Sequence, residues 1–133
     1  MPATIMDGPS LSAVIASGPV YPSRFVNYGT SDFQVVQASN GGQSIGISQE
    51  GRSAPPDDEN SSTSYAGTTG DLVAIYGVGR TCLLELGTTV TVGAVLGPGS
   101  DGKGILAASN PVGAIAKQGG VSGDLIQVVV EVS

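Results

Sequence analysis

The 133-residue sequence contains no histidine, no tryptophan and a single cysteine. Without histidine, neither a serine–histidine catalytic pair nor a histidine-ligated metal site can form. Without tryptophan, the widest aromatic platform for stacking a sugar ring is missing. The single cysteine, Cys82, excludes an intrachain disulfide and lies in the apolar run Thr81-Cys82-Leu83-Leu84. This setting predicts a small buried hydrophobic residue rather than an activated nucleophile.

Charge is also scarce, because only 12% of the residues are charged. The formal net charge is -6, and the five basic residues are scattered: Arg24, Arg52, Arg80, Lys103 and Lys117. Nucleic acid and anionic membranes are therefore not expected as partners, since both bind clustered cations. No apolar run approaches the roughly 18 residues of a membrane span, and the N-terminus lacks the pattern of a signal peptide. We expect synthesis in the cytosol.

The residues that are abundant favour strands and turns. Glycine occurs 21 times, aromatic residues make up only 5%, and Val, Thr, Ser and Ala are frequent. Few helix formers remain, and the core must be aliphatic. The length fits one domain. Short strands at regular spacing with glycine-rich turns between them predict an all-β fold, a small β-barrel or sandwich.

The chain ends on a β-branched run, Gly123-Asp124-Leu125-Ile126-Gln127-Val128-Val129-Val130, and the same phrase occurs earlier as Gly70-Asp71-Leu72-Val73-Ala74-Ile75. The earlier strand is either the pairing partner of the terminal strand or its counterpart in a related half. Two further phrases recur in the same order: Phe33–Asn40 parallels Ile105–Asn110, and Ser44–Gln49 parallels Pro111–Ala116. The order of the three phrases predicts two pseudo-repeated halves.

Two segments stand outside the repeat. Residues 1–22, rich in proline and glycine, predict an extended N-terminal arm with one short extended piece at Leu11–Ala16, and residues 23–133 form the β domain. Residues 50–68 are a long polar loop with an acidic run, and the second half needs only 117–122 at the same place. The loop is therefore an insertion on a frame that closes without it, which makes it a candidate contact surface.

The carboxylates do not indicate an active site. Asp57, Asp58 and Glu59 are adjacent in sequence and lack the spacing of a calcium loop, so we expect a solvated loop rather than a metal site. Glu85 and Glu131 fit the outward positions of alternating strands better than an acid pair. Asp71 and Asp124 share one setting just before a strand, which indicates turn residues. We predict no catalytic residue, no cofactor and no metal.

The ordered phrases resemble the capsid cement (head decoration) proteins of tailed bacteriophages. The resemblance rests on these phrases: Arg24-Phe25-Val26, Ser44–Gln49, Gly70–Gly77, Thr91–Leu96, Asp101-Gly102-Lys103-Gly104, Val112–Ala116 and Gly123–Val128. It covers about residues 24 to 133, and the order of the phrases carries it. The chain departs from the family pattern at Ala94, where an Asp is common, and in the long 50–68 loop.

The resemblance implies a virion protein on the outer surface of an assembled head, made in the host cytoplasm. It would stabilise capsomer junctions, with the major capsid protein as partner and a homo-oligomer as the active form, a trimer rather than a dimer. Such a protein needs no catalysis, only a rigid frame with segments that order on binding. The candidate contact residues are Leu11, Val14, Ile15, Val20 and Tyr21 in the arm, and Asp57, Asp58, Glu59 and Tyr65 in the loop.

Two alternatives remain at this stage. A carbohydrate-binding β module would need a tyrosine-lined groove, with Tyr28, Tyr65 and Tyr76 as the available rings. A phage tail or fibre component would use the same kind of turn-rich β frame.

Overall fold

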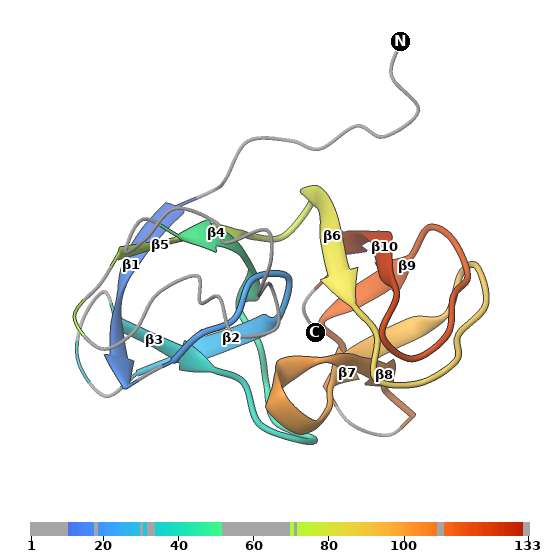
Figure 1. Cartoon of the computed structure of the whole chain (residues 1–133), viewed down its shortest axis with the longest axis horizontal. Coiled ribbons are helices and arrows are strands. Elements are labelled where there is room, and N and C mark those ends of the chain that lie inside the picture. Colours follow the sequence, from blue (N-terminus) through green and yellow to red (C-terminus); the bar gives the residue numbers. More distant parts are fainter. Residues whose placement is uncertain are drawn as a thin grey trace, which may run out of the picture.

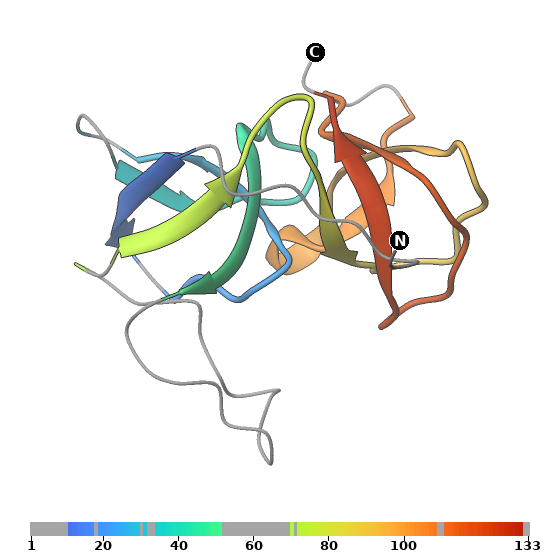
Figure 2. The ribbon, with the colours of Figure 1, turned by 90° about the horizontal axis from the view of Figure 1, so that it is seen from above.

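The computed structural model describes residues 11–17, 19–29, 31, 34–51, 70, 72–108 and 111–131. These residues form two lobes that lie side by side, as both views show (Figures 1 and 2). Lobe 1 comprises residues 11–76 and lobe 2 residues 81–130. Strands make up both lobes, and no α-helix occurs in the described ranges. The prediction of a small all-β barrel or sandwich is confirmed.

Lobe 1 contains β1 (Leu11–Ser17), β2 (Phe25–Tyr28), β3 (Gln34–Gln37), β4 (Gly46–Gly51) and β5 (Leu72–Tyr76). Lobe 2 contains β6 (Thr81–Glu85), β7 (Val95–Pro98), β8 (Gly104–Leu106), β9 (Ala114–Ala116) and β10 (Leu125–Val130). A 3-10 turn, Ser100–Gly102, lies between β7 and β8.

Lobe 1 is a closed barrel in the order β1-β3-β2-β4-β5, with β5 paired back to β1. Closure leaves no unpaired strand edge. The barrel corrects the predicted arm, because β1 pairs with β3 and β5 and its inward residues Ala13 and Ile15 are buried. The short extended piece expected at Leu11–Ala16 is this strand, so the residues from 11 onward belong to the barrel. Residues 1–10 lie outside the described part of the chain.

Lobe 2 has the strand order β6-β10-β9-β7-β8. Its two outer strands approach each other at one point, where Leu86 forms a parallel bridge with Gly104. The N–H of Gly87 donates to the carbonyl of Gly104 at 2.8 Å and continues this contact. The second sheet therefore curls back on itself almost as completely as the first.

The two lobes share one topology. If β1 to β5 are matched in order with β6 to β10, each pair of neighbouring strands in lobe 1 corresponds to a pair of neighbouring strands in lobe 2. Each lobe has one parallel contact at the same place, Ile15 with Val35 in lobe 1 and Leu86 with Gly104 in lobe 2. The predicted duplication is confirmed, and β10 is the counterpart of β5 rather than its pairing partner.

Two turns repeat with their backbone conformation. Ser23 and Gly93 both have positive φ (60° and 84°), and their N–H groups donate to Ser48 and Ala116, which occupy matching positions. Gly70 and Gly123 likewise have positive φ, at 90° and 94°. Each of these sharp reversals precedes the second or the fifth strand of its lobe. The duplication therefore extends to local geometry that short glycine-rich phrases specify.

The register of the repeat differs from the sequence alignment by one residue. Val26 pairs with Gly46 in lobe 1, and its equivalent Leu96 pairs with Ala114 in lobe 2. Gly46 thus corresponds to Ala114, whereas matching the glycines of the two phrases aligns it with Gly113. Because side chains alternate between faces along a strand, a slip of one residue exchanges inward and outward positions.

The loop prediction also needs a small correction. Glu50 and Gly51, assigned to the 50–68 loop, are the last residues of β4, where the pairing with β5 shifts between Ser48 and Gly51. The chain from β4 to β5 is still much longer than the chain from β9 to β10, so the insertion within the repeat is real. Asp57, Asp58, Glu59 and Tyr65 lie outside the described residues.

Two hydrophobic clusters fill the molecule. The first is the interior of the lobe 1 barrel: Ala13, Ile15, Val20, Val26, Val35, Val73 and Ile75. The second combines the interior of lobe 2 with Phe25, Ala38, Ile47 and Tyr76 of lobe 1. Adjacent residues on a strand face opposite ways, so Val26 points into the barrel while Phe25 points at lobe 2. The two lobes are thus joined by a continuous core.

Gly113 of lobe 2 leaves room for the Phe25 ring, since a Cβ at Gly113 would lie 2.5 Å from Phe25 Cε1. We expect Gly113→Ala to lower the free energy of unfolding by about 1–3 kcal/mol, the usual cost of overpacking a core. Urea denaturation measures this loss. The variant Phe25→Leu supplies the control, because Gly113→Ala should cost less in that background. Equal costs in both backgrounds would show that the ring is not the obstacle.

Candidate interaction surface

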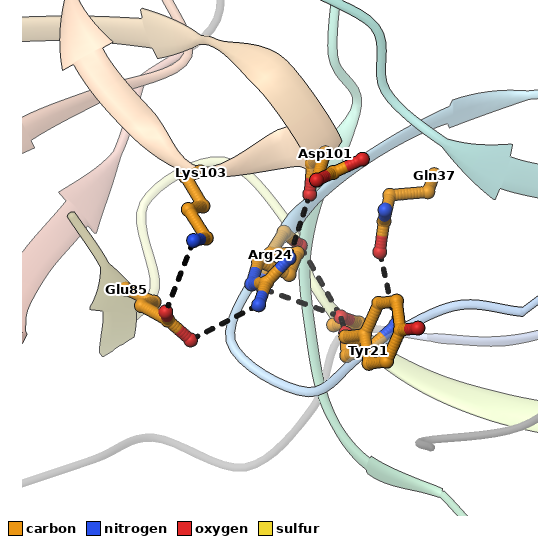
Figure 3. Close-up of polar contacts among 7 residues, drawn as sticks. Tyr21, Arg24, Gln37, Glu85, Asp101 and Lys103 are labelled. Atoms are coloured by element: carbon orange, nitrogen blue, oxygen red, sulfur yellow. Dashed lines mark hydrogen bonds and ion pairs between the residues drawn. The ribbon is translucent and has the colours of Figure 1, made fainter. Parts of the chain in front are cut away.

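Arg24 is the polar centre of the joint between the lobes. Its side chain is 11% exposed and its Nη2 lies 3.1 Å from Oε1 of Glu85 on β6. Its Nη1 donates to the carbonyl of Asp101 at 2.9 Å, and its guanidinium lies 5.1 Å from the centre of the Tyr21 ring. Figure 3 shows these groups converging from both lobes. A lobe 1 residue therefore binds lobe 2 by a charge pair and a backbone contact, while the Tyr21 ring of its own lobe packs against its guanidinium.

Backbone contacts flank this ion pair. The N–H of Glu85 donates to the carbonyl of Ser23 at 2.9 Å, and the N–H of Gly41 donates to the carbonyl of Pro98 at 2.9 Å. The side-chain amide of Gln49 donates to the carbonyl of Leu83 at 3.1 Å. Lys103 adds a longer ion pair, 3.7 Å from Nζ to Oε2 of Glu85. These contacts fix the orientation of the lobes, and they serve structure rather than chemistry.

The carboxylates of the described residues do not form an acid pair. Glu85 is ion-paired in the joint and pairs with Leu125 at the start of β10. Glu131 is exposed and follows the other end of β10, so the two carboxylates lie at opposite ends of that strand. Asp124 accepts a hydrogen bond from the N–H of Val121 at 2.9 Å, which confirms its turn role. Cys82 is fully buried, as predicted. Within the described ranges, no group of three potential metal ligands occurs.

The candidate contact residues of the arm divide into two groups. Ile15 and Val20 are 1% and 0% exposed in the barrel core, so the prediction that they contact a partner is wrong. They are apolar because they fill the interior of a closed barrel. Val14 and Tyr21 are half-buried, and Leu11 begins β1 at the pairing position opposite Ile75. Only Val14 and Tyr21 present described side chains that reach the surface.

The tyrosine groove of the carbohydrate-binding alternative does not form from the described rings. Tyr76 is 7% exposed and belongs to the core that joins the lobes, while Tyr28 is 71% exposed. A sugar ring cannot stack on Tyr76 without opening the joint. Tyr65 lies outside the described residues.

Several large apolar side chains lie on the surface, and only Tyr28 among them was named from the sequence as a possible contact residue. They are Tyr28, Val78, Val92, Val95, Leu106, Val121 and Leu125, each at least 43% exposed. Val78, Val92 and Val121 occupy tight turns next to glycine or serine, where exposure is expected. Val95 lies on β7 and Leu106 on β8. The repeat could have identified Val95 and Leu106, because their equivalents in lobe 1, Phe25 and Gln37, contact lobe 2.

No helix in the described part of the chain is long and apolar enough to cross a membrane.

Arg24 provides a test of the joint. We expect Arg24→Ala to lower the free energy of unfolding by about 1–3 kcal/mol, because it strands a partly buried carboxylate and removes the contact with Tyr21. Lys103→Ala is the matched control and should change it by less than about 0.5 kcal/mol, because that ion pair is longer and more exposed. Chemical denaturation of both variants gives the comparison. Equal losses of unfolding free energy in the two variants would show that Arg24 stabilises the joint no more than Lys103 does.

No protein-family model and no curated protein matches this sequence. The chain is similar to a solved structure, the crystal structure of the head fiber gp8.5 N base in bacteriophage phi29. The similarity has a TM-score of 0.60 and covers 96% of this chain and 95% of that chain, at 20% sequence identity. At this identity the likeness establishes a shared fold over both lobes.

Proposed function

We propose that this protein is a non-enzymatic structural protein of a bacteriophage head. It binds the outer surface of the assembled capsid, with the major capsid protein as its partner, and stabilises capsomer junctions as a cement protein. The observation that carries the proposal is the likeness to a phage head fiber base along both lobes. The order of phrases shared with cement proteins supports it independently.

The geometry is consistent with this role. A closed barrel, a second sheet that curls back on itself and a continuous apolar joint make a two-lobe body with little exposed strand edge among the described residues. Asp124 is used in a turn and Glu85 in the joint, and within the described ranges no group of three potential metal ligands occurs. Many copies on a capsid lattice gain avidity, so each contact need not be strong. The proposed contacts are the acidic run Asp57-Asp58-Glu59 with Tyr65, and Leu11, Val14 and Tyr21 of the predicted arm.

A second candidate is the base of a head fibre. The similar structure is itself described as the base of such a fiber, which specifically favours this alternative. Both roles require attachment to a head. They differ in consequence, because cement strengthens the shell whereas a fibre base only anchors an appendage.

Co-sedimentation with expanded phage heads that lack this protein tests the attachment. We expect saturable binding at a fixed number of copies per head. The triple variant Asp57→Asn, Asp58→Asn, Glu59→Gln should bind less tightly if the acidic run contacts the capsid, while remaining folded by circular dichroism. Absence of binding by the wild-type chain to any head lattice would overturn the proposal.

Heating decorated and undecorated heads separates the two roles. A cement protein should raise the temperature at which packaged DNA is released, because its bonds across capsomer junctions must break before the shell opens. A fibre base should bind to saturation and leave that temperature unchanged. Dye-accessible DNA, followed during a thermal ramp, reports the release.

A further inference from the structure

The joint inside the chain uses two different surfaces. Lobe 1 contributes the outward row Phe25, Ile47 and Tyr76, which runs across β2, β4 and β5. All three side chains are at most 7% exposed, because lobe 2 covers them. Arg24 and Gln37 extend this surface, Arg24 through Glu85 and Gln37 through close approach to Gly102.

The repeat places the same surface on lobe 2. Val95 pairs with Ile115 and Ile115 with Val129, as Phe25 pairs with Ile47 and Ile47 with Tyr76. Ala94 corresponds to Arg24, the residue before the second strand. Leu106 corresponds to Gln37, because Leu106 pairs with Leu96 as Gln37 pairs with Val26. We call Val95, Leu106, Ile115 and Val129 the Val95 face; Ala94 itself packs against the lobe 2 core.

The Val95 face is apolar and open to solvent. Val95 and Leu106 are 43% and 52% exposed, and Ile115 and Val129 are half-buried. The two polar members of the lobe 1 surface, Arg24 and Gln37, are replaced here by Ala94 and Leu106. An outward strand position normally carries a polar residue when water covers it. Apolar residues at every position of the face therefore indicate that a partner covers it.

The complementary surface repeats as well. Lobe 2 receives lobe 1 through Glu85, Pro98 and Gly113, which contact Arg24, Gly41 and Phe25 respectively. By their strand pairing and backbone hydrogen bonds, the equivalents of Glu85, Pro98 and Gly113 in lobe 1 are Val14, Tyr28 and Ile45, in that order.

We call Val14, Tyr28 and Ile45 the Tyr28 face. Tyr28 is 71% exposed, and Val14 and Ile45 are half-buried. Their equivalents share one side of lobe 2, so these three share one side of lobe 1. Ile45 also packs against the barrel core and fills the space that its equivalent Gly113 leaves open in lobe 2, where the smaller Val95 takes the place of Phe25 on the opposing face. This face carries no charged residue where lobe 2 has Glu85.

We propose that the Val95 face of one copy of this chain binds the Tyr28 face of a second copy, in the arrangement that already joins lobe 1 to lobe 2. The joint between the lobes is the model for this contact, because the Val95 face is equivalent to the lobe 1 surface of the joint and the Tyr28 face to its lobe 2 surface. The same arrangement can therefore be repeated from one copy to the next. Such head-to-tail contacts produce rings or chains rather than twofold dimers. The proposal concerns self-association and stands whether or not the protein binds a phage head.

A lysine on either face tests the contact without risk to the core. Val95→Lys and Tyr28→Lys change exposed side chains, and each reduces the net negative charge of the chain, so general repulsion cannot explain dissociation. Val121→Lys is the matched control, a lysine at a 54% exposed valine outside both faces. Sedimentation equilibrium gives the mass, and circular dichroism confirms folding.

We expect wild type and Val121→Lys to assemble and each face variant to associate at least about tenfold more weakly, as for a charge placed in an apolar interface. Equimolar Val95→Lys and Tyr28→Lys should form a dimer, because each retains the face that the other lacks. A monomeric wild type would overturn the proposal. So would a Tyr28→Lys variant that assembles like wild type, which would indicate a different occupant or a twofold contact between Val95 faces.

Discussion

The row formed by Phe25, Ile47 and Tyr76 is the interaction on which the rest of the molecule depends. Each residue sits on the outside of a closed barrel, where a free lobe would place polar side chains, and each is buried by the neighbouring lobe. Burial of such apolar surface stabilises by about 25 cal/mol for each Å² removed from water. Two units too small to hold large cores alone become one rigid body through this row.

Polar contacts at the joint select its geometry rather than supply most of its stability. The Arg24–Glu85 pair is partly screened by solvent, and ion pairs of that kind contribute little by themselves. Its directionality, with the backbone bonds of Glu85 and Gly41, fixes one orientation of the lobes. The proposed attachment to a capsid would require one orientation, because the contacts would have to match a repeating lattice.

Much of the fold followed from local sequence, and the errors have physical causes. Gly-Asp-Leu phrases predicted β5 and β10 because a sharp turn followed by β-branched residues has few other solutions. The proline- and glycine-rich start obscured β1, whose place depends on distant partners in β3 and β5. For the same reason Ile15 and Val20 were predicted to contact a partner. Burial is decided by pairing across the chain, which local patterns do not encode.

The connection between β4 and β5 has a practical consequence. Its counterpart between β9 and β10 shows that the barrel closes with only a short link, and closure entropy rises slowly as a loop lengthens. Peptides grafted at this point would leave the ten paired strands undisturbed. The scaffold therefore offers a site for inserting foreign sequences, which the proposed capsid attachment would display in many copies.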